Sequence, residues 1–187
     1  MIKSLSLIIA ALTISACTQV ITATTEQPLQ EDPSTRSLGS YIDDEIIETK
    51  ISVNIRNTSA ELEAAHINAV SHNGIVLLTG QAPNNDLVNQ AFDIAEAVKK
   101  VRKVHNEISI GENSSMLARS NDTWISTKVK SKLSLNSQLD ASRIKVVTEN
   151  GTVYLMGLVS QAEAETASKV ASETSGVQKV VRVFEYY

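Results

Sequence analysis

The sequence predicts an α+β protein made of two tandem units that share one fold. The first observation is an internal repeat, in which residues 73–80 (NGIVLLTG) align with residues 150–157 (NGTVYLMG) at an offset of 77. The second is the order of helical and strand periodicities, which is the same in both copies. The third is an Asn-Gly pair between two apolar runs in each copy. We therefore expect a first domain at 41–112 and a second domain at 119–187.

Two helices are predicted in each unit. Ile47, Ile51 and Ile55 recur at i, i+4 and i+8, which predicts an amphipathic helix over 43–57. Residues 85–99 carry apolar side chains at the same helical spacing. The corresponding helices of the second unit are expected at 121–135 and 161–174.

Three strands complete each unit. The apolar runs 67–70 and 75–78 enclose Asn73-Gly74, which predicts a hairpin because a type I′ turn needs a positive φ at both positions. Gly80 is expected to close the second strand. The remaining strands are expected at 102–110, 143–149, 152–158 and 177–186.

The resulting order in each unit is α-β-β-α-β. The second helix is long enough to connect parallel strands, so we expect a three-stranded mixed sheet with two helices on one face. A unit of about 70 residues is only marginally stable by itself, so the two domains are expected to pack on one another.

The first residues have the features of a secretory signal peptide at 1–16. Lys3 precedes an apolar stretch that is too short to span a bilayer, and small residues follow it. The tetrapeptide ISAC ending at Cys17 resembles the lipobox of bacterial lipoproteins. This resemblance implies a diacylglyceryl group on Cys17, cleavage before it and acylation, such as by palmitate, of the new N-terminus. The alternative is an ordinary signal peptide with a chance cysteine.

Residues 17–40 are predicted to form the lipidated N-terminus and a flexible tether. They are polar and contain Pro28 and Pro33, so they lack the apolar surface needed to fold. Some twenty flexible residues reach about 25 Å. Thr18 follows the cysteine where an Asp would favour the inner membrane, and by the sorting rule of enterobacteria-like lipoproteins this implies the outer membrane.

Composition excludes several classes of function. The formal charge of -4 argues against a nucleic-acid partner, and a single cysteine excludes an intramolecular disulfide. His66, His72 and His105 lack the spacing of a metal site. Asp43, Asp44 and Glu45 are interpreted as first-turn residues that suit the helix dipole. No nucleophile elbow or phosphate loop occurs, so we expect neither an enzyme nor a cofactor.

The hairpin motif Asn-Gly-Xaa-Val-Xaa-Leu-Xaa-Gly, present in both copies behind a lipobox, resembles the BON-domain family. It is most similar to the two-domain lipoproteins of that family, over about three quarters of the chain. The resemblance implies a periplasm-facing outer-membrane lipoprotein that binds anionic phospholipid through its second domain. It also implies enrichment at division sites and a role in outer-membrane integrity.

The first helix of the second unit differs in charge from its counterpart in the first unit. Residues 43–58 carry a net formal charge of -2, whereas residues 121–136 carry +2. On a helix, Trp124, Lys128 and Leu135 form one stripe, about 100° from a core stripe. Lys132 lies between the two. A Trp and a Leu beside lysines are typical of a membrane-surface helix. The predicted phospholipid-binding residues are Trp124, Lys128, Val129, Lys130, Lys132, Leu133 and Leu135.

The family resemblance supports that set in part. It implies that the same helix contacts lipid in the two-domain lipoproteins, with Trp124, Lys128, Val129 and Leu133 at matching positions and Lys130 keeping its charge. Ser134 departs from the pattern, because the two-domain lipoproteins have an apolar residue at this position. Leu135 is expected to substitute in part for that apolar side chain.

Two other interpretations remain open at the level of sequence. Trp124 could pack on the other domain or on the tether, with the lysines forming only a solvated face. Alternatively, the protein could be an envelope adaptor or a periplasmic chaperone for outer-membrane protein assembly, using its acidic first domain and exposed strand edges.

Overall fold

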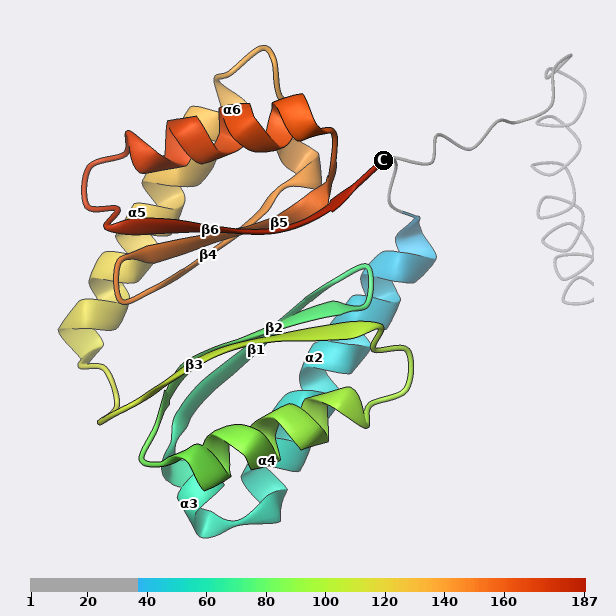
Figure 1. Ribbon diagram of the computed structural model, residues 1–187, viewed down its shortest axis with the longest axis vertical. Coiled ribbons are helices and arrows are strands. Elements are labelled where there is room, and N and C mark those ends of the chain that lie inside the picture. Colours follow the sequence, from blue (N-terminus) through green and yellow to red (C-terminus); the bar gives the residue numbers. More distant parts are fainter. Residues whose placement is uncertain (1–36) are drawn as a thin grey trace, which may run out of the picture. The chain divides into compact units, whose positions relative to one another are not determined.

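The computed structural model describes residues 37–187 (Figure 1). The predicted signal peptide, Cys17 and the tether up to residue 36 lie outside the described residues. The first domain contains α2 (Leu38–Thr58), α3 (Ala60–Ala64), β1 (His66–His72), β2 (Ile75–Ala82), α4 (Asn85–Glu96) and β3 (Lys103–Ile110). The second domain contains α5 (Met116–Ser134), the 3-10 turn η1 (Ala141–Arg143), β4 (Lys145–Glu149), β5 (Thr152–Val159), α6 (Gln161–Ser172) and β6 (Lys179–Tyr186).

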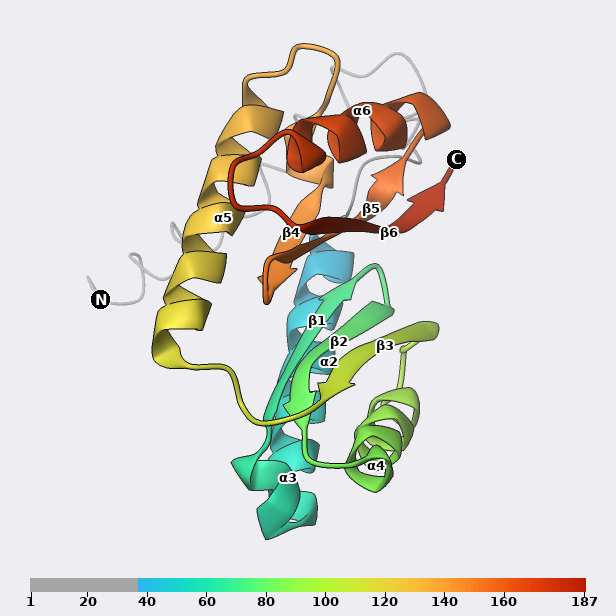
Figure 2. The ribbon, with the colours of Figure 1, turned by 60° about the vertical axis from the view of Figure 1, so that its left-hand side comes forward.

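Both predicted mixed sheets are confirmed. In each one the middle strand, β2 or β5, pairs antiparallel with the strand before it and parallel with the strand after the second helix (Figure 2). The helices α2 and α4 cover one face of the first sheet, and α5 and α6 cover one face of the second (Figure 1). The short helix α3 was not anticipated from the sequence.

The first helix of each domain begins five residues earlier than its periodicity indicates. Ser37 caps α2 by accepting a hydrogen bond from the backbone N–H of Ser40. Ser115 caps α5 in the same way through the N–H of Ala118. Each cap satisfies an N–H group that the start of a helix would otherwise leave without a partner. The caps therefore add more than one turn to each helix.

The two predicted Asn-Gly turns are present, and a buried aspartate fixes each of them. Asn73 and Gly74 have positive φ angles of 53° and 74°, as a type I′ turn requires. Asp44 of α2 accepts hydrogen bonds from the backbone N–H groups of both residues, at 2.7 and 2.8 Å. Asp44 therefore anchors the hairpin, and it lies beyond the first helical turn to which the sequence interpretation assigned it.

The second domain repeats this arrangement. Asp122 of α5 accepts from the N–H groups of Asn150 and Gly151, at 2.8 and 2.9 Å. Its side chain is buried, so the turn amides supply the partners that water would otherwise provide. In each domain one carboxylate thus joins the first helix to the hairpin.

Gly80 does not close the second strand as predicted, since β2 continues to Ala82. At Gly80 the backbone has a φ of 117°, and an added Cβ would lie 1.8 Å from the carbonyl oxygen of His66 on the paired strand. The glycine is therefore required for close approach of β1 and β2, and the antiparallel ladder extends past it to Gln81.

Alternate residues of the middle strands serve two different apolar clusters. On β2, Val76 and Leu78 point into the core beneath α2 and α4. Ile75 and Leu77 belong instead to a cluster that contains residues of the second domain: Tyr154, Met156 and Val183. The expectation that the domains pack together is thereby confirmed. It also explains why the hairpin runs are apolar without a break.

Polar contacts surround this interdomain cluster. Lys145 on β4 forms an ion pair with Glu48 of α2 at 2.7 Å, and Arg102 pairs with Glu185 at 2.8 Å. Burial, with the carboxylates of Glu107 and Glu149 as further causes, raises the pKa of Tyr154 to about 12. The tyrosine therefore stays neutral within the interface at physiological pH.

Removing the Asp122 carboxylate should destabilise the protein. Asp122→Ala leaves two N–H groups of the hairpin turn without acceptors, so we expect a loss of about 1–3 kcal/mol in the free energy of unfolding. Urea denaturation of residues 18–187 measures this loss. The control is Glu45→Ala, an exposed acid on α2, for which the change should stay within about 0.5 kcal/mol. Equal midpoints for the two variants would contradict the proposed role of Asp122.

Acidification should weaken the fold through His105. This residue lies beside Leu77 in the parallel register, and burial, with the Lys103 ammonium as a second cause, lowers the pKa of its imidazole. The unfolded chain therefore takes up the proton first, so stability is full above about pH 6.5 and falls as the pH drops below it. Urea midpoints at pH 7.5 and 5.5 should differ less in His105→Gln than in the wild type. An unchanged difference would mean that other groups cause the loss.

Candidate functional site

The core face of α5 is formed by three apolar residues. Ile125, Val129 and Leu133 are at most 1 % exposed and pack against the second sheet and α6. Val129 and Leu133 were included in the predicted binding set, and this placement is a correction. They support the helix from beneath, because a helix cannot turn the same side chains both to its core and to the surface.

A second face of α5 presents an apolar stripe to solvent. Leu117 is 81 % exposed, Trp124 62 % and Leu135 86 %. Their spacings of 7 and 11 residues are close to two and three helical turns, so they lie on one side of the helix. At 1.5 Å per residue the stripe is about 27 Å long. Leu117 precedes residue 121, where the apolar periodicity predicts the start of this helix, although Ser115 is a readable N-cap signal.

Two lysines flank this stripe and are held in place by backbone oxygens. Lys132 donates a hydrogen bond from Nζ to the carbonyl of Glu173 at 3.0 Å, and Lys128 donates to the carbonyl of Ser175. Glu173 caps the C-terminus of α6, where the helix dipole is negative. Each ammonium has three N–H donors, so two on each lysine are left for an external acceptor.

Lys130 lies on a different flank of α5. It lines a groove of about 340 Å³ together with residues of β1 and β4, among them His66 and Glu149. On a helical projection its direction is about 120° or more from Trp124 and Lys128. The structure thus separates the three lysines that the sequence analysis grouped together.

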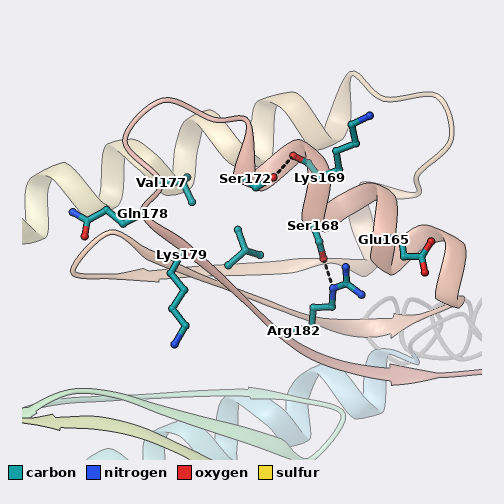
Figure 3. A pocket seen from close by; sticks show the side chains of 9 residues that line it. Glu165, Ser168, Lys169, Ser172, Val177, Gln178, Lys179 and Arg182 are labelled. Carbon is teal, nitrogen blue, oxygen red and sulfur yellow. Dashed lines mark hydrogen bonds between the residues drawn. The ribbon is translucent and has the colours of Figure 1, made fainter.

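A pocket of about 470 Å³ between α6 and β6 is also lined by basic side chains (Figure 3). Arg182 donates from Nε to the hydroxyl of Ser168 at 2.7 Å. Lys169 and Lys179 point in opposite directions from it (Figure 3). Because these three cations do not converge on one point, the pocket lacks the geometry of a phosphate site.

The family model for the BON domain matches residues 43–112 and again residues 121–186. The chain belongs to the BON-domain family. The αββαβ units described above are therefore BON domains, and the candidate stripe lies on the first helix of the second one.

Three relatives are similar to most of the chain. The outer membrane lipoprotein DolP of Haemophilus influenzae is 42% identical over 152 residues, covering 81% of this chain and 78% of the relative. A 21 kDa hemolysin of Actinobacillus pleuropneumoniae is also 42% identical, over 151 residues and the same shares. The osmotically-inducible protein Y of Escherichia coli is 25% identical over 152 residues, covering 80% of this chain and 75% of the relative.

These relationships establish a DolP-like envelope lipoprotein with two BON domains. The relative from Haemophilus influenzae is named an outer membrane lipoprotein, which agrees with the predicted location of this chain at the outer membrane, anchored by lipid and facing the periplasm. Cys17, the residue predicted to carry the lipid, lies outside the described residues and stays a prediction. Within residues 37–187 no helix is both long and apolar enough to cross a bilayer.

The remaining candidate groups of the sequence analysis are placed in structural roles. Asp43 pairs with Lys100 at 2.7 Å, and Asp44 anchors the hairpin of the first BON domain. His66 begins β1 and His72 ends it, while His105 is on β3. Among the described residues, no three His, Cys, Asp or Glu side chains are grouped so that they could hold a metal ion.

Proposed function

We propose that the second BON domain binds anionic phospholipid of the outer membrane through the outward face of α5. The contact consists of the apolar residues Leu117, Trp124 and Leu135 and the cations Lys128 and Lys132. The activity is binding rather than catalysis. Through it, the protein would support outer-membrane integrity and gather at division sites, as proposed from the family resemblance.

The exposure of Trp124 is the observation that carries the proposal. A lone tryptophan that served the fold would be covered by its own chain, whereas this one is 62 % exposed between two more exposed leucines. Tryptophan prefers the level of the lipid headgroups, where the ring is in apolar surroundings and its N–H stays hydrated. The length of the stripe suits a helix that lies in the plane of the membrane.

The two lysines supply the preference for anionic lipid. Each lysine close to an anionic surface contributes about 1 kcal/mol of attraction. Their hydrogen bonds to the end of α6 reduce the number of positions that the side chains sample, so less entropy is lost when they meet a phosphate. The lipid anchor keeps the domain close to the bilayer, so that weak contacts of this kind become effective.

A substitution of Trp124 tests the proposed lipid contact. Residues 18–187 carrying Trp124→Glu should lose binding to vesicles that contain anionic lipid by about tenfold or more, because a carboxylate replaces the ring at the headgroup level. Co-sedimentation at two salt concentrations measures the loss. Thr123→Glu is the matched control, since it puts the same charge on the neighbouring exposed position, outside the stripe.

If Trp124→Glu leaves vesicle binding unchanged, α5 is not part of the binding site. Absence of binding by the wild type would instead favour the adaptor or chaperone interpretation, with the outer-membrane protein assembly machinery as the partner to be tested.

Substitutions of the lysines test whether Lys128 and Lys132 contribute more to binding than Lys130. Lys128→Gln with Lys132→Gln should weaken binding to anionic vesicles by about tenfold or more at low salt, as two contributions of about 1 kcal/mol are lost. Lys130→Gln, which removes a charge from the groove on the other flank, should have a clearly smaller effect per lysine. An equal loss per lysine at all three positions would mean that only the net charge of the domain matters.

A further inference from the structure

The first BON domain has an exposed apolar stripe of its own, on α2. Leu38, Ile42, Ile46 and Val53 are spaced by 4, 4 and 7 residues and therefore lie on one side of the helix. The core residues of α2, which include Ile51, point to the opposite side. The helix is thus apolar on two faces, although only one of them is covered by the domain.

Exposure along this stripe decreases from the N-terminus of the helix. Leu38 is 76 % exposed, Ile42 51 %, Ile46 44 % and Val53 38 %. Soluble domains rarely leave contiguous apolar patches in water unless the patch contacts a membrane or another protein. The apolar surface that needs a cover is therefore concentrated in the first three turns of α2.

Most of the acidic side chains that distinguish this helix in the sequence have partners within the protein. Asp43 forms an ion pair with Lys100, and Glu48 forms one with Lys145, both at 2.7 Å. Asp44 is buried against the hairpin turn. Three of the four acids of residues 43–58 are therefore taken up by contacts within the protein.

The charges of this window that keep no ion pair among residues 37–187 are Glu45, Lys50 and Arg56. They leave no excess of negative charge on the outer face of α2. An anionic membrane surface would therefore not repel this helix, contrary to what the count of -2 for residues 43–58 indicates.

The position of α2 in the chain identifies the surface that covers it. Its N-cap is Ser37, and only residues 18–36 separate it from Cys17, where the anchor is predicted. Because the anchor holds this end of the domain near the bilayer, lipid is at a high effective concentration around the first turns of α2. The stripe is most exposed at the same end.

We propose that the N-terminal half of α2 inserts Leu38, Ile42 and Ile46 into the membrane that carries the anchor. A paired helix from a second copy would bury the stripe evenly, whereas the observed gradient suits a helix whose anchored end lies deepest. This contact does not depend on the one proposed for α5. It lacks a lysine pair and rests on apolar burial, so it needs no anionic lipid and is insensitive to salt.

The test uses the mature, acylated lipoprotein in phosphatidylcholine vesicles. The single cysteine of the chain is blocked by its lipid, so Ile42→Cys provides one reactive thiol for a fluorophore. Asn54→Cys, an exposed position outside the stripe near the other end of α2, is the control. Since interfacial helices bury their apolar face roughly 5–10 Å deep, a quencher on the lipid chains should quench the label at 42 about twofold more than the label at 54.

Equal quenching at the two positions would overturn the proposal. Disulfide-linked dimers of Ile42→Cys would also overturn it, by showing that a second copy covers the stripe. The measurement is repeated in a Trp124→Glu background and at high salt. Quenching at 42 that survives both conditions supports a contact separate from α5, and its loss under either would contradict that separation.

A pair of matched variants tests the apolar side chains directly. With the label on Ile46→Cys, Leu38→Glu together with Ile42→Glu should abolish the quenching, because two carboxylates resist burial in lipid. Asn54→Glu places a carboxylate on the exposed surface of α2 outside the stripe and should leave the quenching unchanged. Quenching at 46 that persists in the double variant would overturn the role of this stripe.

Discussion

One buried carboxylate in each domain holds together the parts on which the rest of the structure depends. Asp44 and Asp122 each accept two backbone N–H groups from an Asn-Gly turn. A carboxylate without these partners could not be buried, and the turn amides would lose their acceptors. The contact also fixes the rotation of the helix about its axis. Trp124, two residues after Asp122 and about 200° further round the helix, is thereby directed away from the sheet.

The middle strands carry the second constraint, because they are covered on both faces. One set of alternate side chains packs beneath the helices, and the other set packs against the second domain. Neither domain could expose this inner face without leaving residues such as Leu77 and Met156 in water. Each small BON domain thus obtains from its neighbour apolar burial that its own length does not provide.

The two domains share a scaffold but differ on the outer faces of their first helices. Ile46 of α2 and Trp124 of α5 occupy equivalent positions of the repeat, and both are exposed. Around Trp124 the fold leaves lysines available, whereas around Ile46 it pairs two of the four acids with lysines and buries a third. Solvent-facing positions are free of the packing constraints that keep the cores alike, so the same fold can present two chemically different outer surfaces.

The sequence by itself determined the repeat, the αββαβ order, the Asn-Gly turns and the core stripe of each helix. These features depend on local periodicity and on φ angles that few residues adopt. The early start of α5, and with it Leu117, was within reach of the sequence through the Ser115 cap. Only the tertiary structure assigned Asp44 and Asp122 to the turns and paired Asp43 and Glu48 of α2 with lysines. Such partners lie tens of residues apart in the chain, and their meeting depends on how helix, hairpin and neighbouring domain pack together.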